Sequence, residues 1–141
     1  MRKYFVLIAA LFVSCLYAQH GVVGKWKTID DETGKAISIV EIYEKNGKIY
    51  GRVEDIFNPK SKNRTCENCA GEDKNKPIMG LTVIKGLVKD GDEYNGGKIL
   101  DPKSGKLYKC YITLEDKDKL KVRGYIGISL LGRTQYWHRV K

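Results

Sequence analysis

The sequence predicts an all-β fold built from antiparallel strands. Short runs rich in Val, Ile, Tyr and Thr alternate with turn signals along most of the chain. No convincing helical period appears among them. Most connections are as short as hairpin turns, which favours an up-and-down meander that closes into a barrel and leaves no free edge. We therefore expect an antiparallel barrel of about eight strands. A β-sandwich is the alternative, but it usually needs longer crossing connections.

The first half of the predicted barrel has three strands, at residues 22–29, 36–45 and 48–57. A polar connection, DDETGK, joins the first two. Asn46 and Gly47 form a strong hairpin signal between the second and third strands, because both residues tolerate positive φ angles. The longest irregular stretch then follows, at residues 58–77, and it carries two cysteines.

The second half has five predicted strands, at residues 81–89, 93–101, 106–114, 119–126 and 133–140. Short polar turns separate most of them, including Pro102–Gly105. Gly96-Gly97-Lys98 is similar to the end of a phosphate-binding loop, but Ile99 stands where that loop needs Ser or Thr. We interpret these glycines as a bulge or turn within a strand.

The N-terminus has the layout of a secretory signal peptide. Arg2 and Lys3 precede an uncharged apolar run at residues 4–14, and small residues lead to a cleavage site after Ala18. The run is too short for a transmembrane helix. We expect a signal peptide at 1–18, a single barrel domain at 19–141, and a periplasmic or secreted protein. In a second interpretation, Cys15 is the lipidated N-terminus of a lipoprotein, because Ser14-Cys15 ends a stretch similar to a lipobox.

The predicted mature chain is basic. The 26 basic residues less Arg2 and Lys3 leave 24 against 17 acidic residues, a net charge of +7. These charges are dispersed and interleaved with acidic residues, whereas nucleic-acid-binding proteins concentrate them on one element. We expect no nucleic-acid partner and no transmembrane segment after signal cleavage. Attraction to anionic envelope polymers or lipid headgroups is a further interpretation.

The cysteines of the mature chain allow three interpretations. Export favours oxidation, so Cys66 and Cys69 are expected to form a disulfide in the long connection. They could instead be half of a zinc site, but that needs two more ligands, and only Cys110, His20 and His138 are available. A redox-active pair is the third interpretation, although such pairs usually begin a helix rather than occupy a polar loop. The sequence leaves the partner of Cys110 open, and we expect neither a metal nor a cofactor.

Catalytic motifs are not evident. The chain has no G-x-S-x-G sequence, and its two histidines offer few acid–base groups. The last predicted strand is more informative, because a period of two places four residues on one face: Arg133, Gln135, Trp137 and Arg139. This mixed face suggests a polar interior, a ligand, or an arginine stacked on Trp26. A core of aromatic residues with a salt-bridged surface is the alternative.

Gly24-Lys25-Trp26 near the start and Trp137-His138-Arg139 near the end resemble the calycin arrangement, in which a first-strand tryptophan packs against a basic residue. More specifically, the chain resembles the exported bacterial domain-of-unknown-function family twenty-one forty-seven. The matching stretches are GKW at 24–26, KPIMGLTVIKGL at 76–87, GGKILDPKSGKLY at 96–108 and LKVRGYIGISLLGRTQYWHRV at 120–140. The resemblance implies a lipocalin-like barrel in an envelope or secreted protein, and it implies no activity.

These observations predict a non-enzymatic barrel that binds a small apolar or amphipathic molecule, or an envelope component, in its mouth. The residues expected to line or support the site are Trp26, Arg123, Tyr125, Trp137 and Arg139. In an alternative interpretation, Trp26 and Arg139 have a purely structural role and close one end of the barrel. Two other functions stay open: a redox or metal-responsive envelope protein that uses Cys66 and Cys69, and a structural or interaction module.

Overall fold

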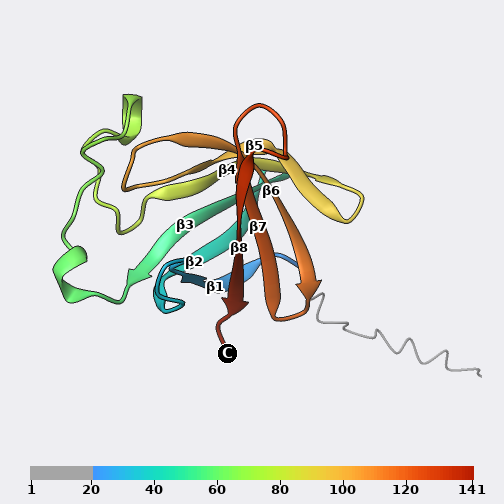
Figure 1. The fold of residues 1–141 in the computed structure, drawn as a ribbon, viewed down its shortest axis with the longest axis horizontal. Coiled ribbons are helices and arrows are strands. Elements are labelled where there is room, and N and C mark those ends of the chain that lie inside the picture. Colours follow the sequence, from blue (N-terminus) through green and yellow to red (C-terminus); the bar gives the residue numbers. More distant parts are fainter. Residues whose placement is uncertain (1–20) are drawn as a thin grey trace, which may run out of the picture.

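The computed structural model of the protein describes residues 21–141, so the predicted signal peptide and Cys15 lie outside the described residues. The strands are β1 (Gly24–Ile29), β2 (Ala36–Lys45), β3 (Lys48–Ile56), β4 (Thr82–Asp90), β5 (Glu93–Leu100), β6 (Leu107–Asp116), β7 (Lys119–Tyr125) and β8 (Gly132–Arg139) (Figure 1). Two short 3₁₀ helices, η1 (Pro59–Ser61) and η2 (Gly71–Asp73), lie in the long connection between β3 and β4. Among the described residues, none forms a helix with the length and apolar character needed to cross a membrane.

The strands form a closed antiparallel barrel in which each pairs with its neighbours in the sequence, and β8 returns to β1. This confirms the predicted all-β barrel, with strand bounds within two residues of those expected from the sequence. The seam between β1 and β8 is short, because only Trp26↔Arg139 and Lys27↔His138 pair across it. The other neighbouring strands pair over three to eight positions.

Residues with positive φ angles explain two local features, the turn between β2 and β3 and a bulge in β5. Asn46 and Gly47 both have positive φ angles, which makes the tight turn between β2 and β3 that the sequence predicts. In β5, Gly96 has a positive φ angle and the register with β6 shifts between Tyr94 and Gly97, which confirms the predicted bulge. A Cβ atom at Gly97 would lie 2.2 Å from the Lys85 carbonyl oxygen, so only glycine fits there.

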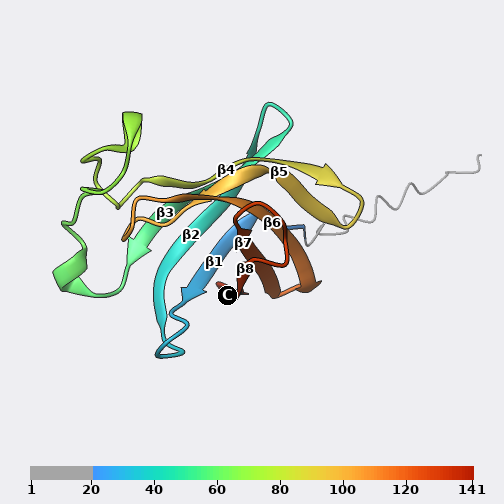
Figure 2. The ribbon, with the colours of Figure 1, turned by 45° about the horizontal axis from the view of Figure 1, so that its top comes forward.

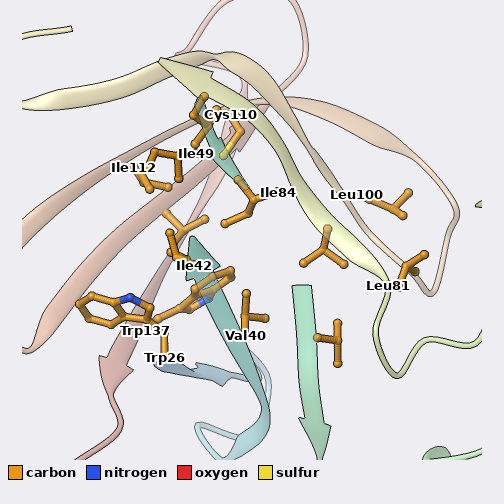
Figure 3. Close-up of a cluster of buried hydrophobic side chains, with 14 of the residues drawn as sticks. Trp26, Val40, Ile42, Ile49, Leu81, Ile84, Leu100, Cys110, Ile112 and Trp137 are labelled. Carbon is orange, nitrogen blue, oxygen red and sulfur yellow. The ribbon is translucent and has the colours of Figure 1, made fainter. Parts of the chain in front are cut away.

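Side chains fill the barrel interior. Alternate residues of the strands are buried, as the period of two requires. Trp26, Ile42, Ile84, Ile112 and Leu120 have no exposed surface. Figure 3 shows several of these side chains converging on Trp26 and Trp137 from different strands. A barrel of eight strands is narrow enough for side chains to fill, and this one uses large aliphatic and indole groups.

In an up-and-down barrel, alternate connections lie at the same end, so the connections of this barrel fall into two groups (Figures 1 and 2). The chain segment before β1, the tight turns after β2, β4 and β6, and the C-terminus lie at what we call the Trp26 end. The other four connections lie at the loop end, at residues 30–35, 57–81, 101–106 and 126–131.

Candidate functional site at the loop end of the barrel

Trp26 and Arg139 close the Trp26 end. The Trp26 indole is fully buried and donates a hydrogen bond of 2.8 Å from Nε1 to the Val22 carbonyl. The Arg139 guanidinium lies 4.3 Å from the centre of an indole ring of Trp26. Arg139 also donates to the carbonyls of Gly21 and Lys117, at 2.7 Å each. The arginine expected to stack on Trp26 is therefore present, and it links the segment before β1 to β8 and to the turn between β6 and β7.

Trp137 lies inside the barrel and begins a polar chain toward the loop end. Its indole Nε1 donates to Gln135 Oε1 at 3.0 Å, and its side chain is only 3% exposed. Gln135 Nε2 in turn donates to Asp31 Oδ2 at 3.4 Å. Arg133, one step further along the same face of β8, forms an ion pair with Asp31. The mixed face predicted for the last strand is thus apolar at its buried middle and polar toward the loop end.

These contacts also bridge the barrel seam. The β1–β8 pairing stops at Lys27 and His138, so beyond this point no paired residues join the two strands. Asp31, in the connection after β1, reaches Arg133 and Gln135 of β8. The loop end of the seam is therefore linked by polar side chains.

Arg123 and Tyr125 lie on the outer face of β7. The alternation along this strand turns Leu120 and Val122 inward, which places the odd-numbered residues outside. Arg123 donates from Nε and Nη2 to the Ser129 carbonyl at 2.8 and 2.6 Å. The Tyr125 ring centre is 6.3 Å from that of Tyr111. The structure therefore separates the five predicted ligand-binding residues, with Trp26, Trp137 and Arg139 on the inner face and Arg123 and Tyr125 outside.

The β7–β8 loop exposes an apolar surface that the sequence reasoning missed. Its four large apolar side chains, between 60% and 84% exposed, are those of Ile126, Ile128, Leu130 and Leu131, which we call the apolar tip. The loop stands out at the top of Figure 1 in red. The signal was visible in the sequence as IGISLLG, an apolar run where the other connections are polar. Contiguous exposed apolar groups of this kind mark binding surfaces.

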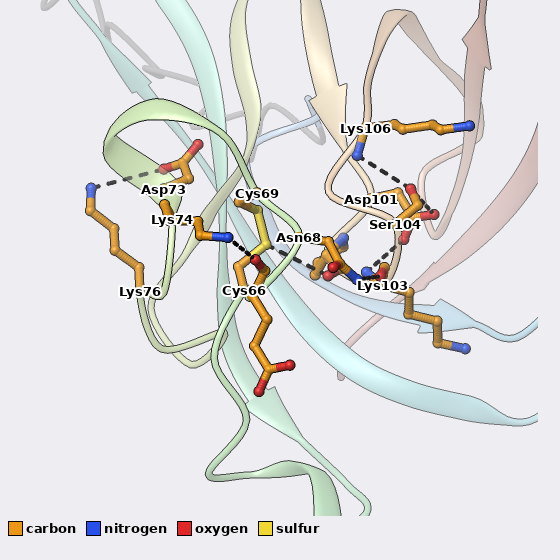
Figure 4. The surroundings of a disulfide bond; sticks show 12 residues. Cys66, Asn68, Cys69, Asp73, Lys74, Lys76, Asp101, Lys103, Ser104 and Lys106 are labelled. Atoms are coloured by element: carbon orange, nitrogen blue, oxygen red, sulfur yellow. Dashed lines mark hydrogen bonds and ion pairs between the residues drawn. A yellow bond between two sulfur atoms is a disulfide. The ribbon is translucent and has the colours of Figure 1, made fainter.

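Cys66 and Cys69 form a disulfide, as predicted, with Cα atoms 5.3 Å apart (Figure 4). Both are buried where the long connection packs on the β5–β6 turn. Asn68, between them, donates from Nδ2 to the Lys103 carbonyl at 3.0 Å. A Cβ atom at Gly105 of the same turn would lie 1.9 Å from the Asn68 carbonyl oxygen, so the contact depends on glycine. The disulfide therefore lies in a close contact between two connections of the loop end.

Cys110 is a free thiol in the barrel interior. Burial raises the pKa of this thiol to about 12, because the thiolate would lose its hydration. Within residues 21–141, no three His, Cys, Asp or Glu side chains are grouped so that they could hold a metal ion. The zinc interpretation of Cys66 and Cys69 therefore lacks its further ligands in this part of the chain.

Two surface cavities accompany these features. One, of about 240 Å³, lies between the long connection and the β5–β6 turn, next to Asn68 and Lys103. The other, of about 380 Å³, lies at the Trp26 end between the segment before β1, including Gly21, and the strand pair that includes Tyr94 and Leu114. None of the five predicted ligand-binding residues lines either cavity.

The closed eight-stranded antiparallel barrel, in which an arginine of the last strand stacks on a tryptophan of the first, has a lipocalin-like fold. The chain belongs to a bacterial family described as "uncharacterized protein conserved in bacteria (DUF2147)", whose model matches residues 24–139.

A solved structure supports the same fold. The chain is similar to a protein of Helicobacter pylori, HP1028, which is described as belonging to the lipocalin family. The two share 23% sequence identity, and the TM-score is 0.75 over 86% of this chain and 84% of the other. No curated protein matches the sequence.

Proposed function

We propose that this protein is an exported, non-enzymatic binding protein that holds one small apolar or amphipathic molecule at the loop end of its barrel. The signal-peptide pattern at residues 1–18 supports export. The disulfide between Cys66 and Cys69 agrees with it, since disulfides persist in oxidising compartments. The lipocalin-like fold agrees with ligand binding, but a fold alone does not define a function.

The apolar tip beside a polar group carries the proposal. The tip ends at Leu131, and Arg133 follows two residues later with its ion pair to Asp31. An amphipathic molecule needs both kinds of surface, an apolar one for its chain and a charged or hydrogen-bonding one for its head. The filled interior around Trp26 supports a site at the rim rather than deep in the barrel.

The proposed polar contacts are Arg133 and Gln135. The Arg133 side chain is 70% exposed, so its guanidinium can donate hydrogen bonds to a carboxylate or phosphate as well as to Asp31. Gln135 links this group to the Trp137 indole. Binding at Arg133 is therefore expected to change the environment of Trp137.

The test is a titration of delipidated protein that carries Trp26→Phe, so that Trp137 is the remaining tryptophan. We expect a saturable change in Trp137 emission with a monomeric long-chain fatty acid or lysophospholipid. Leu131→Ser should weaken binding about tenfold, whereas Val88→Ser, at an exposed valine of β4, should not. The absence of a saturable response to both ligand classes would refute the proposal.

Export has its own test. The intact mass of the native protein should equal that of a chain that begins at Gln19 after signal cleavage. In the second interpretation, it should equal that of a chain that begins at a lipidated Cys15. Gentle ionisation of the same sample should retain a co-purified molecule. A native protein that is found inside the cell with residues 1–18 still attached would contradict export.

A further inference from the structure

Three lysines form a row across the outer face of neighbouring strands. Lys85 of β4 pairs with Lys98 of β5, and Lys98 pairs with Lys109 of β6. Like charges directly opposite each other on a sheet destabilise it. Asp73 binds Lys85 at 2.5 Å, but within residues 21–141 no carboxylate pairs with Lys98 or Lys109. We call these three residues the basic row, and its two unpaired members are exposed.

The basic row leads to the base of the apolar tip. Lys109 pairs with Tyr125, the last residue of β7, and donates from Nζ to the Gly127 carbonyl at 3.4 Å. Further cations lie on the same outer face, where Lys121 Nζ is 5.7 Å from the Tyr111 ring centre. Cationic and aromatic side chains thus surround the base of an exposed apolar loop, an arrangement that suits the boundary between lipid headgroups and acyl chains.

Several backbone carbonyls of the loop already have hydrogen-bond partners within the protein, which suits an apolar medium. A peptide carbonyl that leaves water without a hydrogen-bond partner is strongly unfavourable in an apolar medium. In this loop Arg123 binds the Ser129 carbonyl through two nitrogens, and Lys109 binds that of Gly127. The amide of Ile126 donates to the Leu131 carbonyl at 3.1 Å. The amide of Leu131 donates to the Ile128 carbonyl at 3.0 Å, so four carbonyls of the loop are bonded within the protein, while its apolar side chains are exposed.

We propose that the apolar tip and the basic row together dock the protein on the surface of an anionic phospholipid bilayer. The four side chains of the tip enter the interface, and Lys98 and Lys109 bind lipid phosphates. Charge complementarity selects this partner, because no carboxylate of the described residues pairs with the two lysines and the predicted mature chain carries a net charge of +7. The proposal extends the proposed function and shares with it the apolar tip and the location in the cell envelope.

The test is co-sedimentation of ligand-free protein with phosphatidylcholine vesicles that contain or lack phosphatidylglycerol. We expect binding that requires phosphatidylglycerol and falls with salt. Lys98→Glu with Lys109→Glu should lower the partition coefficient about 100-fold. Leu130→Ser with Leu131→Ser should lower it about tenfold or more.

Matched control variants separate a defined surface from general properties of the chain. Lys45 and Lys48 are also exposed lysines paired directly opposite each other, but at the Trp26 end. Lys45→Glu with Lys48→Glu makes the same change in net charge and should leave most of the binding. Val23→Ser with Val88→Ser removes exposed apolar groups away from the tip and should have little effect. Circular dichroism confirms that each variant is folded.

Each other result overturns the proposal. Failure of the wild-type protein to bind phosphatidylglycerol vesicles rejects it directly. Equal losses in both lysine variants would mean that net charge alone drives binding, and unchanged binding in the Leu130 and Leu131 variant would exclude the tip. A dimer in solution that this variant abolishes would assign the tip to a second copy. Fatty-acid titration without vesicles tests the proposed function separately, so the two failures are distinguishable.

Discussion

The two ends of the barrel use polar and apolar groups in opposite ways. At the Trp26 end, the indole is buried and Arg139 bonds to backbone carbonyls of two separate segments. At the loop end, four large apolar side chains are in solvent, and Arg133 is mostly exposed. Groups already bonded within the protein stabilise the fold, whereas groups left exposed are available to a partner. Substitutions of Trp26 or Arg139 should therefore affect stability, whereas substitutions of Arg133 or of the apolar tip should affect binding.

The largest expected effect on stability is at Trp26. Trp26→Ala removes a fully buried indole and its hydrogen bond to Val22, which should lower the free energy of unfolding by about 3–5 kcal/mol. Urea denaturation followed by circular dichroism measures this loss. Trp26→Phe keeps part of the ring volume and should cost less. A loss below about 1 kcal/mol for the alanine variant would contradict the role of Trp26 in closing this end.

The next largest effect on stability is expected at Arg139, and it is compared with the effect at Arg133 of the other end. Arg139→Ala removes the contact with Trp26 and the bonds to the carbonyls of Gly21 and Lys117, which should cost about 2–4 kcal/mol. Arg133→Ala removes only an exposed ion pair and should cost less than about 1 kcal/mol. Denaturant midpoints of the two variants check the difference. Equal losses in the free energy of unfolding for the two variants would contradict the proposed difference between the two ends.

The disulfide should contribute a moderate amount of stability at the loop end. Cys66→Ser with Cys69→Ser opens a short loop and should lower the free energy of unfolding by about 2 kcal/mol, with the barrel retained. Thermal unfolding with and without reductant measures this effect, and reductant should not change the variant. If instead the variant keeps its stability but loses a biological activity, the redox interpretation gains support.

The smallest effect concerns Cys110 and depends on pH. Because burial raises the pKa of this thiol to about 12, the folded protein keeps the proton at a pH where the unfolded chain releases it. Cys110 therefore favours unfolding as the pH rises above the ordinary thiol pKa. Relative to Cys110→Ala, the wild type should lose about 1.4 kcal/mol between about pH 8 and pH 10. Parallel pH profiles of the two proteins would show that the thiol is accessible to water.

Local signals predicted much of the fold because each element is encoded near its own residues. The turn at Asn46-Gly47 and the bulge at Gly96-Gly97 follow from glycine and asparagine conformations. The inward face of β8 follows from a period of two, which also indicated its polar residues. Each strand pairs with sequence neighbours, so no long-range pairing had to be guessed except the seam.

The candidate site was harder to predict, because it depends on how separate connections meet. Arg123 is near Trp137 in the sequence, but it lies on the outer face because Val122 turns inward. The pairing of Asp31 with Arg133 joins the first connection to the last strand, and no local pattern indicates it. The apolar tip was detectable in the sequence, but an apolar run between two strands also resembles an extension of either strand.

The short seam has a consequence for how the chain is made. Synthesis proceeds from β1 to β8, so the edge of β1 that later faces β8 has no partner until β8 has been made. A chain truncated before Gly132 would keep two unpaired edges, at β1 and β7, and unpaired strand edges template aggregation. Completion of the last strand is thus the step that turns an aggregation-prone meander into a closed barrel.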